Sequence, residues 1–314
     1  MMGDLICQAL NELMPCQVRR GELPLADRSL RWVEAGSGSP AVVLEAALGE
    51  PASLAYAGVL PAVAEQVRVI AYDRAGIGAS DPVSQITVMS QVSDLAAIAT
   101  AAGDGPCILA GHSWGGLLVL LAAAQHPDLI AGLVLIDPAD EIYWSKLPPE
   151  IHQQSTDSGT MIMERHAAGD LAAVVRESFT PFVNRLTDNQ RHRNLLLDAY
   201  ESCYVTEWQA SMVLAESDLF SSSISLIHQI RSAAPLPDVP VVVLSATKGA
   251  EAEHRAMWTA VHADLAKSVS RGTHTVLADT HHAINEERPE AIASAITQVI
   301  ADVRSGWQSR ELAR

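Results

Sequence analysis

Several features that would define a disulfide-rich, nucleic-acid-binding or metal-binding protein are scarce in this sequence. It has four cysteines, and their spacing matches neither a zinc site nor a disulfide framework: Cys7, Cys16, Cys107 and Cys203. It has 21 Lys and Arg residues against 37 Asp and Glu residues, a formal net charge of −16. The clustered cations that bind nucleic acid or an anionic membrane are therefore missing. We expect no metal and no nucleic-acid or membrane partner.

Long apolar runs are also absent. The longest, near residues 117–124, is far below the ~18 residues that a membrane span requires. Residues 1–16 lack the basic stretch and apolar core of a secretory signal, so we expect a cytoplasmic protein with reduced thiols. The same residues have the pattern of a short amphipathic helix, which could close a pocket or pair two subunits into a homodimer.

Short β-branched runs alternate with longer helical stretches from residue 41 onward. Runs at 41–46, 67–73, 107–111, 132–137 and 240–246 are apolar along their whole length, as in strands buried on both faces of a parallel sheet. Candidate helices at 53–65, 87–101 and 114–126 supply the crossovers that parallel strands need. Segments 17–23 and 28–35 alternate more and predict an antiparallel edge. The fold class is α/β, with a doubly wound, mostly parallel sheet.

The strand pattern stops between about residues 140 and 235, and VVVL then resumes it. We interpret residues 140–235 as an inserted helical cap on a core made of residues 1–139 and 236–314. Eight of the fourteen aromatic residues fall in the cap, where they could form its own core or line a substrate pocket: Tyr143, Trp144, Phe179, Phe182, Tyr200, Tyr204, Trp208 and Phe220. After the cap, the pattern predicts helices near 254–267 and 289–304 and a last strand near 272–278.

The segment GHSWGG, residues 111–116, fits G-x-S-x-G, in which a serine sits on a strained turn between a strand and a helix. The flanking glycines let the turn pack tightly and expose the serine oxygen at the sheet edge. The pentapeptide alone is a weak signal, but a buried strand precedes it and a helix follows it. We therefore predict that Ser113 is a nucleophile, and we expect His112 to face away and pack against the sheet.

A serine nucleophile needs a base, and the base needs a group that orients it. The carboxyl ends of parallel strands share one edge of the sheet, so residues just past those ends can meet. Asp137 ends the strand after that of Ser113, and His282 follows the last strand. The order serine, aspartate, histidine is the one that this arrangement permits.

From about residue 30 to 304 the chain resembles the α/β-hydrolase superfamily, whose fold has an eight-stranded sheet. YDRAGIGASD (72–81) is similar to the loop after the fourth strand, GHSWGG to the nucleophile elbow, and HHAINEERPE (281–290) to the stretch with the catalytic histidine. The usual interval of seven residues before Pro289 indicates His282, although His281 stands where glycine is more usual. Many members carry the acid after the strand that follows the cap, where Glu251 is the alternative to Asp137.

The resemblance also implies an oxyanion hole, formed by the backbone N–H groups of Ala47, with Leu48 as its neighbouring candidate, and of Trp114. The usual histidine-glycine pair before these residues is replaced by Glu45-Ala46. We predict that Glu45 forms a buried or half-buried ion pair with Arg74; the alternative is that Glu45 points to solvent.

The expected activity is hydrolysis of a carboxylic ester, with lactones and amides as alternatives, through an acyl-enzyme and without a cofactor. The aromatic-rich cap favours a mid-sized apolar or aromatic small molecule as substrate. Carbon–carbon bond hydrolysis, perhydrolysis and acyl transfer use the same residues, and a slow-turnover receptor can share the fold. The serine nucleophile disfavours epoxide-hydrolase and dehalogenase chemistry.

Overall fold

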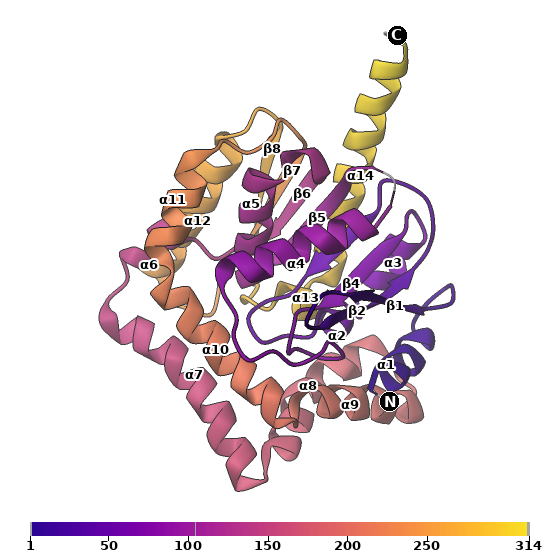
Figure 1. Ribbon diagram of the computed structural model, residues 1–314, viewed down its shortest axis with the longest axis vertical. Coiled ribbons are helices and arrows are strands. Elements are labelled where there is room, and N and C mark those ends of the chain that lie inside the picture. Colours follow the sequence, from indigo (N-terminus) through magenta and orange to yellow (C-terminus); the bar gives the residue numbers. More distant parts are fainter. Residues whose placement is uncertain (1, 104, 313–314) are drawn as a thin grey trace.

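The computed structural model describes residues 2–103 and 105–312, and its centre is one sheet of eight strands (Figure 1). The strand order is β1-β2-β4-β3-β5-β6-β7-β8. The bounds are β1 (Arg19–Pro24), β2 (Ser29–Ala35), β3 (Val42–Glu45), β4 (Val69–Asp73), β5 (Cys107–His112), β6 (Ile130–Ile136), β7 (Val241–Ala246) and β8 (Gly272–Leu277).

The pairing confirms the predicted mixture of directions. Strand β2 pairs antiparallel with β1 and with β4, whereas every other neighbouring pair is parallel. Strands β3 to β7 are buried along their whole length, which explains their unbroken apolar sequences. Strand β8 lies at the sheet edge and is mostly exposed.

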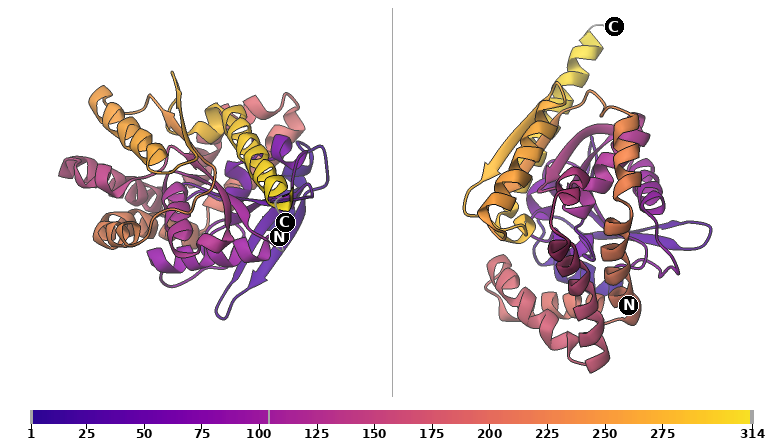
Figure 2. Two further views of the ribbon diagram at one scale, coloured as in Figure 1. Left: turned by 90° about the horizontal axis from the view of Figure 1, so that it is seen from above. Right: turned by 90° about the vertical axis from the view of Figure 1, so that its left-hand side faces the viewer.

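Helices cover both faces of the sheet (Figure 2). Alternate residues of each buried strand enter two apolar clusters. One cluster is covered by α1 (Met2–Asn11), α2 (Ala52–Ala55), α3 (Leu60–Ala64) and α14 (Pro289–Leu312). The other is covered by α4 (Val88–Ala101), α5 (Trp114–Gln125) and α12 (Ala252–Lys267). The short elements η1 (Pro127–Leu129) and α13 (Ile284–Glu287) complete the core.

Six helices, which we call the inserted helices, lie between β6 and β7. They are α6 (Glu141–Ser145), α7 (Pro149–Ala168), α8 (Leu171–Leu186), α9 (Gln190–Tyr204), α10 (Glu207–Ser222) and α11 (Ile224–Ala233). Helix α7 packs on α10 and α8 packs on α9. Helix α1 also packs on α9, so the N-terminal helix joins the inserted helices to the sheet core (Figure 1).

Two helices differ from the sequence prediction. The single helix expected over 53–65 is divided into α2 and α3, because Pro61 near the start of α3 lacks the N–H that a continuous helix would use. Helix α14 continues past the expected end at 304 and projects from the body of the molecule (Figure 1). No helix among the described residues is long and apolar enough to cross a bilayer.

The aromatic residues of the inserted helices have two different roles. Phe179, Phe182, Tyr200 and Tyr204 pack on one another inside the α8–α9 pair. Tyr143, Trp144 and Phe220 instead line the cavity that contains Ser113. Trp208 is 42% exposed. One subset therefore forms a core within the inserted helices, and another lines the cavity next to Ser113.

Candidate active site

Ser113 stands at the sharp turn between β5 and α5. Its backbone has φ +53°, in the left-handed region that costs a non-glycine residue conformational energy. Two backbone hydrogen bonds join the turn to the end of β6 and the segment that follows it. Ser113 N–H donates to the carbonyl of Ile136 at 3.0 Å, and Ser113 O accepts from Ala139 N–H at 2.9 Å. These bonds fix the serine at the carboxyl end of the strand.

Two glycines of the motif allow a close approach to neighbouring backbone. A Cβ on Gly111 would lie 2.4 Å from the carbonyl oxygen of Gly115, and one on Gly115 would lie 2.4 Å from that of Ala46. The absence of these side chains lets the turn pack against the loop that follows β3.

Ser113, His282 and Asp137 form one hydrogen-bonded series. Ser113 Oγ lies 2.9 Å from His282 Nε2, and His282 Nδ1 lies 2.6 Å from Asp137 Oδ2. Asp137 is fully buried, whereas the side chain of His282 is 37% exposed. An imidazole that is held by a carboxylate on one side and contacts a hydroxyl on the other can accept the hydroxyl proton.

The two neighbouring histidines have different contacts. His281 is exposed and bonds Glu287, with its Nδ1 2.8 Å from Oε1. Of the pair, His282 is the one that reaches Ser113.

His112 does not turn away to the sheet as expected, because its Nε2 lies 2.8 Å from the carbonyl oxygen of His282. Its ring also contacts that of His282, at a centroid distance of 4.8 Å. Burial, together with the nearby His282, lowers the pKa of His112 to about 3. A neutral His112 can donate one N–H to that carbonyl and so hold the loop of His282 in place.

Asp137 is held by groups from three directions. Besides His282, its Oδ1 accepts from the N–H of Ala246 at 3.1 Å, and its Oδ2 accepts from Arg255 Nη1 at 2.7 Å. Burial alone would raise the pKa of Asp137, but the bond from His282 and the charge of Arg255 hold it well below its usual range. Asp137 is therefore a carboxylate throughout the neutral pH range.

The sequence analysis missed a face of α12 that contacts the Asp137-Pro138 turn. Arg255, Trp258 and His262 are spaced i, i+3 and i+7, so they lie on one side of the helix. Trp258 Nε1 donates to the carbonyl of Pro138 at 2.9 Å, and His262 Nε2 lies 2.9 Å from the same oxygen. Because Asp137 has φ +42°, this turn is strained and benefits from external support. The only signal in the sequence was the helical spacing of polar residues.

Glu251, the alternative acid, lies at the N-cap of α12, where it is exposed. It lines the same cavity as Ser113. The carboxylate that His282 Nδ1 contacts is that of Asp137, so Asp137 and not Glu251 occupies the position of the acid in the hydrogen-bonded series.

The structure confirms the predicted ion pair beneath the loop that follows β3. Glu45 Oε1 lies 2.6 Å from Arg74 Nη1, with both side chains at most 2% exposed. Burial, only partly opposed by Arg74, raises the pKa of Glu45 to about 7. Arg74 has a second carboxylate partner that the sequence analysis missed, Glu216 of α10, at 2.6 Å. Nothing in the sequence marked Glu216, because its role depends on how α10 packs on the core.

Ser113 opens into a cavity of about 690 Å³. Leu48 and Trp114 line it beside the serine, and Ala47, which is 8% exposed, directly precedes Leu48. Aromatic rings from the inserted helices and α12 form much of the wall: Tyr143, Trp144, Phe220 and Trp258. Asp140, Glu251 and His254 contribute polar groups, whereas no Lys or Arg is among the lining residues that the structure describes. The wall of the cavity is thus largely apolar, and its only described charged side chains other than histidines are the carboxylates of Asp140 and Glu251.

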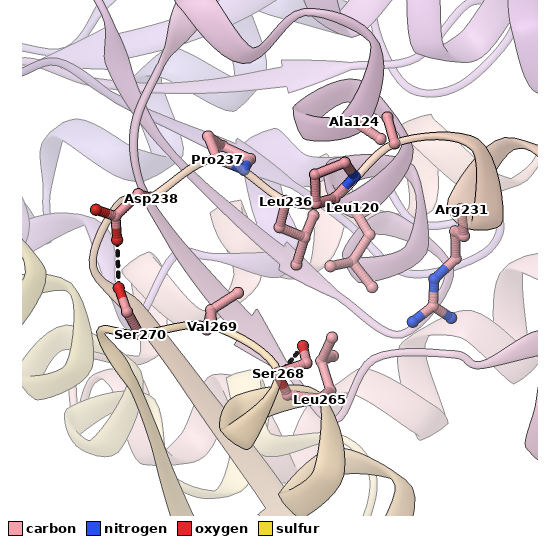
Figure 3. A pocket seen from close by; sticks show the side chains of 12 residues that line it. Leu120, Ala124, Arg231, Leu236, Pro237, Asp238, Leu265, Ser268, Val269 and Ser270 are labelled. Atoms are coloured by element: carbon pink, nitrogen blue, oxygen red, sulfur yellow. Dashed lines mark hydrogen bonds between the residues drawn. The ribbon is translucent and has the colours of Figure 1, made fainter.

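A second hollow, of about 500 Å³, lies between α5, α12 and the segment that joins α11 to β7 (Figure 3). Leu120, Leu236 and Leu265 point into it, and a hydrogen bond joins Asp238 to Ser270 at one end (Figure 3). The lining residues that the structure describes include no histidine that could serve as the base for a serine. Within the described residues, no cluster of three or more His, Cys, Asp or Glu side chains is arranged to hold a metal ion.

The mostly parallel sheet with helices on both faces and the strained serine turn between a strand and a helix are the features of an α/β-hydrolase fold. The chain belongs to the alpha/beta hydrolase fold family, which matches residues 40–289.

Similar proteins include lipases and an epoxide hydrolase. Lipase LipV of Mycobacterium tuberculosis is 42% identical over 74 residues, covering 24% of this chain and 28% of that protein. A soluble epoxide hydrolase of Corynebacterium sp. is 34% identical over 110 residues, 34% of this chain and 37% of that protein. The matches thus span well under half of these relatives. A putative lipase of Acinetobacter baumannii has the same fold, with a TM-score of 0.69 and 18% identity over 98% of this chain and 97% of that one.

Proposed function

We propose that this protein is a serine hydrolase that cleaves carboxylic esters of mid-sized apolar or aromatic molecules through an acyl-enzyme. The observation that carries the proposal is the hydrogen bond between Ser113 Oγ and His282 Nε2, inside a cavity walled by aromatic rings. The similarity of part of the chain to Lipase LipV, and membership of the alpha/beta hydrolase fold family, support an ester as the bond cleaved.

In the proposed first half-reaction, Ser113 Oγ attacks the ester carbonyl carbon while His282 accepts the serine proton. The tetrahedral intermediate collapses, the carbon–oxygen bond to the alcohol breaks, and His282 returns the proton to the leaving alcohol. In the second half-reaction, His282 takes a proton from water, the resulting hydroxide attacks the acyl carbon, and Ser113 recovers its proton as the acid leaves. Asp137 keeps His282 in the required tautomer and stabilises its protonated form.

The developing oxyanion would be bound by the backbone N–H groups of Ala47 and Trp114. Ser113, as N-cap of α5, places Trp114 at the first helical position, where backbone N–H groups have no partner within the helix. Loss of one such donor typically costs ~10²-fold or more in rate. The loop that carries Ala47 is therefore as important to the proposed reaction as the three side chains.

The inserted helices would act as the cap that supplies specificity. Tyr143, Trp144 and Phe220 offer apolar surface to an acyl or alcohol group, and the lack of lining Lys and Arg residues among those described disfavours an anionic substrate. A panel of aryl esters, lactones, aminoacyl anilides and vinylogous diketones separates ester hydrolysis from lactone, amide and carbon–carbon bond cleavage. Added alcohol as a competing acceptor tests acyl transfer.

The proposal is tested by comparing wild type with Ser113→Ala, Asp137→Asn and Glu251→Gln. We expect Ser113→Ala to abolish labelling by a fluorophosphonate probe and to lower kcat on 4-nitrophenyl butyrate by at least ~10⁴-fold. Asp137→Asn should lower kcat by ~10⁴-fold, because the wrong tautomer of His282 becomes favoured.

Glu251→Gln is the matched control, since it alters a carboxylate in the same cavity and should keep kcat within about threefold of wild type. The assignment of the acid is wrong if Glu251→Gln abolishes turnover while Asp137→Asn retains it. A single labelled equivalent without repeated turnover in the wild type would instead indicate a receptor.

A further inference from the structure

Four backbone groups in the loop after β3 are held by buried side chains. Arg74 Nη1 donates to the carbonyl of Ala46 at 2.8 Å, and Arg74 Nη2 donates to that of Ala47 at 2.7 Å. The N–H of Gly49 donates to Glu216 Oε2 at 2.6 Å, and its carbonyl accepts from Gln209 at 2.9 Å. Glu216 and Gln209 both lie on α10, so an inserted helix contacts this loop directly.

The bonds to the carbonyl groups determine where the neighbouring N–H groups point. The carbonyl of Ala46 and the N–H of Ala47 belong to one peptide unit, in which a planar trans bond directs them to opposite sides. Arg74 therefore sets the direction of the Ala47 N–H, and its bond to Ala47 O sets that of Leu48. Ala47 and its neighbouring candidate Leu48 are the residues considered for the oxyanion donor that this loop supplies.

Arg74 is itself fixed by carboxylates. Its Nε donates to Glu216 Oε1 at 2.6 Å, its Nη2 donates to Glu216 Oε2 at 2.8 Å, and its Nη1 donates to Glu45. Together with the two carbonyl groups, these bonds use all five guanidinium donors. Arg74 is 2% exposed and Glu216 is 1% exposed, so water cannot substitute for either partner.

The same carboxylate reaches the other side of the serine turn. Glu216 Oε1 also accepts from Gln91 Nε2 at 2.6 Å, and Gln91 Oε1 accepts from the indole N–H of Trp114 at 2.9 Å. Trp114 supplies the second proposed oxyanion donor through its backbone. One side chain of α10 is thus connected to both residues that would bind the oxyanion.

We propose that Glu216 is a positioning residue, which acts through Arg74 and Gln91 to hold the N–H groups of Ala47 and Trp114 in the geometry that binds the oxyanion. The inference rests on the proposed serine-hydrolase function. On this inference, the sheet core supplies the N–H donors and α10 orients them, so the donors are aligned only when α10 is packed on the core.

The experiment measures kcat, KM and the inhibition constant of a trifluoromethyl ketone analogue of the ester for wild type and Glu216→Gln. We expect Glu216→Gln to lower kcat by ~10- to 100-fold, because misplacement by about 1 Å costs on this scale, while KM changes less than threefold. The ketone binds as a tetrahedral adduct, so its affinity should fall in parallel with kcat/KM. A role in folding alone would lower the melting temperature without this parallel loss.

Asp218→Asn is the matched control, because it makes the same change of charge on an exposed position of α10 and should leave all three constants within about twofold of wild type. Gln91→Leu breaks the connection from Glu216 to the Trp114 indole without changing charge, and it tests the inference if Glu216→Gln does not fold. Its kcat and ketone affinity should fall together by about threefold or more.

The proposal is overturned if a folded Glu216→Gln or Gln91→Leu protein retains wild-type kcat and ketone affinity. It is also overturned if KM rises while kcat is kept, since that would place Glu216 in substrate binding. Failure of the proposed function gives different results. In that case the wild type would hydrolyse no ester of the panel, or the Ser113→Ala variant would hydrolyse esters as fast as the wild type.

Discussion

Glu45 carries its carboxyl group where ionisation is costly. It is fully buried, and burial raises its pKa from 4.5 to about 7 despite the bonds to Arg74 and Tyr72. Between these two values the native state binds a proton that the unfolded state has released. The contribution of Glu45 to the free energy of unfolding therefore falls as pH rises from about 4.5 to 7.

We expect Glu45→Gln to remove this pH dependence. The free energy of unfolding of Glu45→Gln relative to wild type should rise by on the order of 2 kcal/mol between pH 5 and pH 8, since one pKa unit corresponds to about 1.4 kcal/mol. Urea unfolding of both proteins at pH 5, 6, 7 and 8 measures it. Comparing the two proteins cancels the contributions of the other buried groups with shifted pKa, such as Asp73 and His262.

Glu65→Gln, at an exposed position, serves as the control and should give a difference that does not change with pH. A pH-independent difference for Glu45→Gln as well would show that Glu45 is ionised as readily in the folded protein as in the unfolded chain.

At the residue level, the sequence was informative where topology determines position. Ser113 and Asp137 each follow a buried parallel strand, and His282 follows the parallel edge strand β8, so the shared edge of the sheet predicted that they would meet. Glu45 and Arg74 follow the same rule, and their pair was predicted. Glu216 and Arg255 could not be predicted, because they reach the site from helices whose packing no local pattern specifies.

Helix α12 supports the acid of the hydrogen-bonded series. Arg255 bonds the same oxygen of Asp137 that accepts from His282, so its positive charge offsets part of the carboxylate's attraction for a protonated histidine. The other titratable groups that interact with the Asp137 carboxylate are His262 on α12, Tyr143 on α6 and His112 on β5.

We expect Arg255→Met to lower the free energy of unfolding at pH 7 by about 3 kcal/mol, because it removes one partner of a buried ion pair and leaves the Asp137 carboxylate less well compensated. Urea unfolding of both proteins measures the loss. Lys248→Met removes an exposed cation nearby and should change the free energy of unfolding by less than about 0.5 kcal/mol. An Arg255→Met protein as stable as wild type would show that Asp137 is held without this cation.

The elements themselves were predicted with uneven success. The fully apolar runs predicted the bounds of β3 to β7 to within one or two residues, because a strand that is buried on both faces accepts few polar residues. The division of 53–65 into α2 and α3 depends on Pro61, which the apolar pattern outweighed in the sequence analysis. Inside 140–235 the six helices were not separated, since their mutual packing hides the polar face that would mark each one.

For the whole molecule, the dominant electrostatic feature is the net charge of −16. Asp140 and Glu251 add two carboxylates in the cavity itself. The charge of Asp140 is partly offset by Arg231, whose Nη1 donates to Asp140 Oδ2 at 2.7 Å. A negative field repels an anionic substrate during its approach and again inside the cavity. A neutral ester experiences neither effect, so charge should discriminate between esters of similar size.

We therefore expect kcat/KM for mono-4-nitrophenyl glutarate, an anionic ester, to be at least ~10-fold below that for 4-nitrophenyl butyrate at low salt. Added NaCl should raise the value for the anionic ester several-fold between 0.02 and 0.3 M, because the screening length is about 10 Å at 0.1 M, and leave the neutral ester unchanged. Glu251→Gln should reduce the difference in kcat/KM between the neutral and the anionic ester, since it removes a carboxylate from the lining of the cavity. Equal salt dependence for the two esters would mean that the cavity selects by shape, and that the acidic surface has no part in the choice of substrate.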